Sequence, residues 1–203
     1  SGDGKEMKRN KMLQLSIISS VIVSLYMFFR WEIIDIITEF LMLPVLLLVF
    51  GFFIIVSIGT IITLIKNKDW KPIVIQVITI LLLFFVPFNQ IILDINFKMN
   101  KSEREQVAKM VENGELTPNV SHNSSLIHLP KKYEHISSGG GEIMVEKSID
   151  GYNILFFTYR GIMDNFSGFV YTPKDQKLSK KVFNGDFKEI DKMDKKWYFV
   201  GSY

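Results

Sequence analysis

The sequence predicts an all-helical membrane region followed by a small α+β domain with an antiparallel sheet. Residues 12–93 contain only eight charged side chains, whereas residues 98–203 contain 16 Lys or Arg and 14 Asp or Glu. Hydrophobic residues make up 48% of the chain and the mean hydropathy is +0.20, which is high for a soluble protein. We therefore expect a basic N-terminus at residues 1–11, a transmembrane region at 12–97 and an extracytoplasmic domain at 98–203.

The first apolar run covers residues 12–29. Residues 1–6 are small and polar and precede Met7, so we interpret them as an expression remnant. Lys8, Arg9 and Lys11 then give a short basic segment that could open a signal peptide. The run lacks an A-x-A-like cleavage site and continues into Arg30, so we expect a retained transmembrane helix near the lower length limit.

The next apolar block, residues 31–65, is too long for one span. Glu32, Asp35 and Glu39 are spaced by three and four residues, which places them on one face of a helix. Together with Trp31, they favour an interfacial helix over residues 31–43 that lies on the bilayer. The alternative is a single tilted helix with Glu39 buried against a neighbour, so the depth of residues 31–43 stays open. Pro44 suits the first turn of a second span over 44–65, which has no charge.

The third apolar run covers residues 72–93. Pro72 starts it after a short polar loop, and we expect Pro87 to kink the helix or end its straight part. Three basic residues precede the first span, and three lysines lie between the second and third. The loop between the first and second has one arginine and three carboxylates. The positive-inside rule therefore predicts a multi-pass cell-membrane protein with a cytoplasmic N-terminus and an extracellular C-terminal domain.

The C-terminal domain is expected to begin with an amphipathic helix over residues 100–114. Asn100 or Ser102 could cap this helix, and Gly114 could end it. Asp150-Gly151 predicts a two-residue hairpin turn. We expect the helix to cover one face of a meander of about five antiparallel strands, with a further short strand at 126–129. The expected strands are 142–149, 152–162, 166–172, 187–191 and 197–203.

A few polar and glycine residues are candidates for a ligand or partner surface. The glycine triplet at 139–141 could present backbone N–H groups to an anion, but it lacks the Lys-Ser/Thr of a P-loop and precedes a strand, so we favour a flexible turn. Arg160 and Asp164 flank a predicted turn and could pair with Glu142 or His135. The full candidate set is Gly139, Gly140, Gly141, Glu142, Tyr159, Arg160, Asp164 and Tyr171.

The sequence contains no convincing catalytic, cofactor or metal motif. His122, His128 and His135 have spacings of six and seven, which match no zinc pattern, and the chain has no cysteine. It also has no Gly-x-Ser-x-Gly or P-loop. We therefore expect no cofactor and no bound metal, and we interpret the protein as a non-enzyme.

Aromatic residues line three of the predicted strands, and many lysines follow them. One aromatic face must be core, while a second could be core, a binding surface or a face against the membrane segment. The lysines could approach anionic lipid headgroups or cell-wall polymers, or form a solvated loop.

The leading functional hypothesis is a bacterial integral membrane protein with an exported protein-binding domain. The absence of cysteine and the abundance of Ile, Lys, Asn and Phe suit an AT-rich Gram-positive bacterium. The expected partners are the lipid bilayer and another protein, either a secreted toxin, which would make this an immunity protein, or a subunit of an envelope complex. The alternatives are an extracytoplasmic sensor for a small ligand and an envelope hydrolase or transferase. An extracytoplasmic domain argues against nucleic-acid binding.

Overall fold

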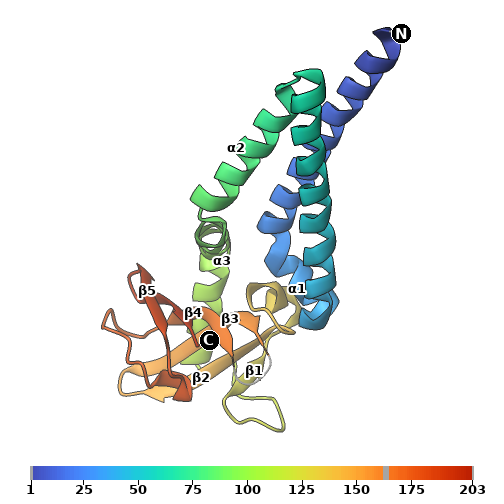
Figure 1. Cartoon of the computed structure of the whole chain (residues 1–203). Helices are drawn as coiled ribbons and strands as arrows, with labels where there is room; N and C mark the ends of the chain where they lie inside the picture. The colour runs from blue at the N-terminus through green and yellow to red at the C-terminus, as the bar shows by residue number, and fades with distance from the viewer. Residues whose placement is uncertain (1, 162–164, 203) are drawn as a thin grey trace. The chain divides into compact units, whose positions relative to one another are not determined.

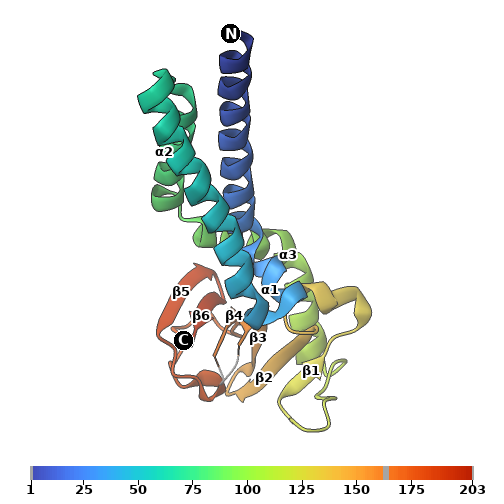
Figure 2. The same cartoon turned by 45° about the vertical axis from the view of Figure 1, so that its right-hand side comes forward.

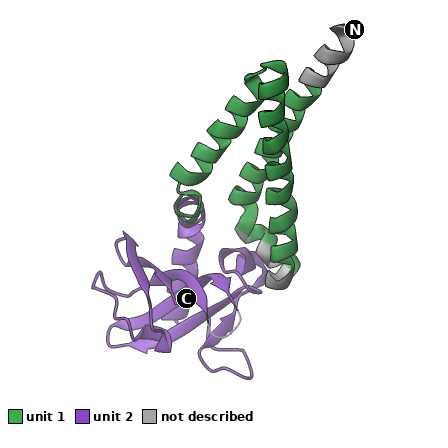
Figure 3. Cartoon of the chain, viewed as in Figure 1, with its two compact units in different colours: residues 1–93 green, residues 94–203 purple. Residues whose placement is uncertain are grey.

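The computed structural model describes residues 2–161 and 165–202; at residues 2–9, 31, 34–36 and 38–40 the description covers the backbone only. The chain divides into two compact units, Ser1–Leu93 and Asp94–Tyr203 (Figure 3). The first unit is helical and the second contains the sheet. A helical N-terminal region followed by a small antiparallel sheet domain agrees with the fold expected from the sequence.

The long helical segment α1 (Gly2–Asn67) folds back on itself. A straight helix would separate Met12 from Gly59 by about 70 Å, at 1.5 Å per residue. Instead, Met12 packs directly on Gly59, and the rings of Tyr26 and Phe50 lie 6.1 Å apart. The chain therefore reverses between Arg30 and Leu41, and two antiparallel halves run side by side (Figure 1).

Two stretches of α1 are long and apolar enough to cross a membrane, Asn10–Arg30 and Leu41–Asn67. The sequence placed the start of the second span at Pro44, as the first turn of a new helix. The second candidate span begins at Leu41, so Pro44 lies in the first turn of the half of α1 that follows the reversal. A separate interfacial helix over residues 31–43 is not resolved from α1; Glu32 is exposed, and the side chains of Trp31, Asp35 and Glu39 lie outside the described residues.

The helices α2 (Lys71–Phe85) and α3 (Phe88–Glu112) meet at a bend of 62°. Val86 is extended and Pro87 follows it, so the break expected at Pro87 is confirmed. If the bent pair counts as one span, the chain has three candidate spans, and otherwise it has two. The expected helix start at Asn100 or Ser102 is wrong, because α3 already begins at Phe88. Its expected end is confirmed by Gly114, whose φ of 75° stops the helix.

The described part of the second unit forms a six-stranded antiparallel sheet in the order β1-β2-β3-β4-β6-β5. Figure 2 shows β1 and β5 at opposite edges. The order corrects the expected meander, since β6 pairs with β4 and leaves β5 at the edge. The expected hairpin is present, but its two turn residues are Ile149 and Asp150, because Ser148 pairs with Gly151. The strands are β1 (Leu126–His128), β2 (Glu142–Ser148), β3 (Gly151–Arg160), β4 (Phe166–Tyr171), β5 (Glu189–Asp194) and β6 (Trp197–Gly201).

Both faces of this sheet are covered. On one face, Phe97 of α3 packs on Phe169 at 5.3 Å and on Trp197 at 5.7 Å between ring centroids. On the other face, the segment 173–188, with its short 3-10 helix η2 (Val182–Asn184), covers a buried cluster. Its members are Leu126, Leu155, Phe157, Val170, Leu178, Phe183, Phe187, Tyr198 and Val200. The described aromatic residues of these strands are therefore shared between two cores.

Candidate functional site

The structure brings together three of the residues that the sequence singled out. Arg160 Nη1 lies 2.5 Å from Glu142 Oε2, and the Arg160 guanidinium sits 4.8 Å above the Phe157 ring. Gly139 lies against the Arg160 side chain, where an added Cβ would come within 2.9 Å of Cδ. With a φ of 76°, this position accepts glycine at no cost and any other residue with strain. The carboxylate partner neutralises Arg160, which leaves little net charge here for an anion.

The other candidates lie elsewhere in the domain. Tyr171 is buried and its hydroxyl donates to Glu112 Oε1 at 3.2 Å. Burial, with Glu112 nearby, raises the pKa of Tyr171 to about 12. Gly141 packs on Glu134 and Gly140 is exposed, while Tyr159 lies against Gly161. Asp164 lies outside the described residues.

Two of the three histidines lie beside different carboxylates. His128 Nε2 lies 3.6 Å from Glu134, and His135 Nε2 lies 2.8 Å from Glu103. Among the described residues, no group of three His, Asp or Glu side chains could hold a metal ion.

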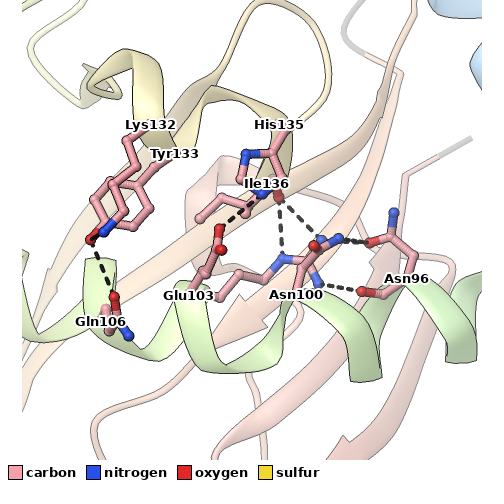
Figure 4. A network of polar contacts seen from close by, with 9 residues as sticks. Asn96, Asn100, Glu103, Gln106, Lys132, Tyr133, His135 and Ile136 are labelled. Atoms are coloured by element: carbon pink, nitrogen blue, oxygen red, sulfur yellow. Dashed lines mark hydrogen bonds and ion pairs between the residues drawn. The ribbon is translucent and has the colours of Figure 1, made fainter.

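Arg104 on α3 is the most deeply buried charge in the second unit, at 1% exposure. Its guanidinium donates to the Ile136 carbonyl at 3.1 and 3.2 Å, to the Asn96 carbonyl at 3.2 Å and to Asn96 Oδ1 at 2.5 Å. Figure 4 shows the two partners, Asn96 and Ile136, within the polar network. It also lies 4.5 Å above the Phe169 ring. Burial lowers the pKa of Arg104 to about 9, so the group stays cationic at neutral pH. No described carboxylate pairs with Arg104. Its hydrogen bonds to Ile136 instead link α3 to the η1 segment (Lys131–Ile136).

A groove of about 600 Å³ lies on the sheet face that segment 173–188 covers. Phe157, Phe166 and Met144 give it an apolar floor, and a second depression of about 360 Å³ continues it past Met144, Phe183 and Asn184. We call this continuous depression the sheet groove. Its described lining is Asn123, Ser125, Met144, Val145, Glu146, Phe157, Arg160, Gly161, Asn165, Phe166, Phe183, Asn184, Gly185, Asp186, Lys188 and Ser202.

One wall of the sheet groove has an unusual backbone. Phe183 and Asn184 both have positive φ, 60° and 51°, which is costly for a bulky residue such as phenylalanine. The buried Phe183 ring and a hydrogen bond from its N–H to the Glu146 carboxylate hold this conformation. The result is an exposed Asn184 side chain at the rim of the groove. The sequence predicted only a lysine-rich loop in this part of the chain. The Asn184-Gly185 dipeptide was the local signal that could have predicted this turn.

The first unit contains a buried polar cluster that the sequence reading missed. Gln76 Nε2 donates to the Ser16 carbonyl at 3.2 Å and to Ser19 Oγ at 2.9 Å, and Ser57 Oγ donates to Gln76 Oε1 at 2.8 Å. Thr79 Oγ1 donates to Ser20 Oγ at 2.8 Å. These bonds join both halves of α1 to α2. The signal was present in the sequence, because each apolar run carries hydroxyl or amide residues spaced by three or four.

Comparison of the chain with protein-family models, with curated proteins and with solved structures finds no match.

Proposed function

We propose that this chain is a bacterial membrane protein whose sheet domain binds a segment of another protein. The observation that carries this proposal is the sheet groove, which is extended and open and has an apolar floor. A small-molecule site usually encloses most of its ligand, whereas an open groove suits a peptide segment. The exposed side chains of Asn165 and Asn184 supply amide donors and acceptors at its rim, as a peptide backbone requires.

The proposed topology has three spans, with the bent pair of α2 and α3 forming the third. Lysines flank the N-terminal end of α1 and the turn between α1 and α2, and the positive-inside rule puts both on the cytoplasmic side. Three crossings then place the sheet domain outside the cell. Residues 31–43, with Trp31, Glu32, Asp35 and Glu39, would lie at the outer interface where α1 reverses.

Single-cysteine labelling tests this topology cleanly, because the chain has no cysteine of its own. His122 and Lys68 are both exposed, one in the sheet domain and one in the turn after α1. We expect a membrane-impermeant maleimide to label His122→Cys in intact cells and Lys68→Cys only after lysis. Labelling of both, or of Lys68→Cys alone, in intact cells would contradict three crossings.

Site-specific photo-crosslinking tests the binding proposal. A photoreactive residue at Asn184 of the full chain should give one discrete protein adduct in the native membrane, and Asn165 should give the same adduct. Asn113 is exposed after α3 and outside the groove, so it serves as the control and should give none. Met144→Glu would put a charge on the half-buried floor and should remove the Asn184 adduct. Equal adducts at Asn113, or an adduct that survives Met144→Glu, would overturn the proposal.

The proposed partner is a secreted toxin, with this chain as its immunity protein, or a subunit of an envelope complex. The second candidate is a sensor for a small ligand, which the contact of Gly139 with Arg160 favours. The ion pair of Arg160 with Glu142 counts against an anion at that place. A ligand that stabilises the full chain and loses this effect in Arg160→Gln, with crosslinking unchanged, would favour the sensor.

A further inference from the structure

A second groove, which shares Lys188 with the described lining of the sheet groove, is rich in lysine. It has a volume of about 630 Å³ and lies between segment 175–180 and the strands β5 and β6. We call it the lysine groove. Its described lining is Asp175, Gln176, Lys177, Leu178, Lys180, Lys188, Ile190, Lys192 and Tyr198.

The lysine groove has an excess of positive charge. Four lysines line it against one carboxylate, and Asp175 already pairs with Lys192 at 2.6 Å. Within the described residues, Lys177, Lys180 and Lys188 have no carboxylate at ion-pair distance. Ammonium groups gathered around one concavity repel each other, and a bound anion relieves that repulsion.

The floor of the lysine groove is apolar and fixed. Leu178 and Tyr198 are each 5% exposed, and Ile190 packs beside them. The Tyr198 hydroxyl donates to the Gln176 carbonyl at 2.8 Å, which ties segment 175–180 to β6. A ligand that fits must therefore carry both an anionic group for the rim and an apolar part for the floor.

We propose that the lysine groove binds the phosphate of an anionic phospholipid, with its glycerol and first acyl carbons on the apolar floor. A lysine ammonium is a compact point charge with three donors, and it binds phosphate oxygens. The described lining of the groove contains four lysines. The helices of the first unit can cross a membrane, so they tether the domain at a high effective concentration of headgroups.

The test uses the full chain in neutral detergent micelles. Ser179→Cys gives a unique exposed site beside the groove for an environment-sensitive fluorophore. We expect saturable binding of short-chain phosphatidylglycerol and none of short-chain phosphatidylcholine. The double variant Lys177→Gln/Lys180→Gln should weaken binding about tenfold to thirtyfold, at roughly fivefold per lysine. Lys109→Gln/Lys131→Gln removes the same charge from exposed sites outside both grooves and should leave binding unchanged.

Three results would overturn the proposal. An equal response to both lipids would exclude headgroup recognition. An equal loss in the control double variant would indicate bulk charge instead of a site. Competition by soluble glycerol phosphate at the same concentration would assign the groove to a free phosphate ligand instead of a lipid. Since Lys177 and Lys180 do not line the sheet groove, Asn184 crosslinking in the Lys177→Gln/Lys180→Gln variant separates this failure from failure of the proposed function.

Discussion

The two units of this chain have opposite interiors. In the first unit, Ser16, Thr60 and Gln76 are at most 1% exposed, while Leu48 is 74% and Ile65 73% exposed. In the second unit the interior is apolar and aromatic, and the lysines and carboxylates lie mostly outside. The first unit therefore exposes many apolar side chains and buries polar ones beside a few apolar ones such as Val23 and Phe53, whereas the second unit buries mainly apolar side chains.

This reversal indicates two different solvents. In water, burying apolar surface drives folding, which suits the sheet domain. In lipid, apolar side chains gain nothing by leaving the bilayer, so helices associate through small residues, close packing and polar bonds. The contact of Gly59 with Met12 and the bonds of Gln76 are of that kind. The reversed interior thus supports membrane association independently of the hydropathy of the helices.

The largest expected effect compares two leucines, one in each unit. Leu155 on β3 is fully buried, and Leu155→Ala should destabilise the sheet domain by about 2–5 kcal/mol. Leu48→Ala, at a position 74% exposed, should change stability by less than about 0.5 kcal/mol. Chemical unfolding of both variants in the same micelles measures the difference. Equal losses of stability would mean that Leu48 packs against protein and that this apolar side chain of the first unit does not face lipid.

The next largest effect concerns Arg104, a charged side chain buried in the otherwise mostly apolar interior of the second unit. Arg104→Ala should cost about 3 kcal/mol, because the Ile136 carbonyl and Asn96 lose their buried donor and a cavity remains. Arg104→Met refills the volume without the donors, so we expect it to recover about half of the loss. Lys109→Ala, exposed on the same helix, is the control and should be neutral. Full stability of Arg104→Met would mean that the hydrogen bonds of Arg104 contribute nothing to the stability of the domain.

Arg104 also shows the limits of sequence prediction. The apolar runs, the kink at Pro87 and the hairpin at Asp150 were predictable because each depends on local chemistry. The burial of Arg104 was not, since its partners at Asn96 and Ile136 come together only when η1 packs on α3. Likewise, the strand order and the cover over the second sheet face depend on long-range pairing. Sequence periodicity cannot specify such contacts. Of the candidate site, the meeting of Glu142 with Arg160 was foreseeable, but the sheet groove was not.

A smaller effect is expected for the polar cluster of the first unit. Gln76→Leu removes three hydrogen bonds to Ser16, Ser19 and Ser57. Such bonds average about 0.6 kcal/mol in membrane proteins, so we expect a loss of about 1–2 kcal/mol. Val77→Leu, one residue further on and 47% exposed, should have no effect. Unfolding in mixed dodecyl sulfate micelles measures both variants. A gain of stability in Gln76→Leu would show that this interior behaves like a water-soluble core.

The smallest effect appears only at alkaline pH and belongs to Tyr171. Burial, followed by the charge of Glu112, raises the pKa of Tyr171 to about 12 from its ordinary value near 10. The folded state therefore keeps the phenol proton more tightly than the unfolded state. The resulting stability is fully present below pH 10 and is lost as the pH rises towards 12.

At pH 8, Tyr171→Phe should be about 1 kcal/mol less stable than the parent, because it lacks the bond to Glu112. Between pH 10 and 12 the parent should lose about 1–2 kcal/mol more than the variant, so the two stability curves converge. Because lysines elsewhere titrate equally in both proteins, chemical unfolding of the pair isolates this residue. A difference that stays constant from pH 8 to 12 would mean that Tyr171 is solvated in the folded domain, and that the second unit is less closed than its aromatic core indicates.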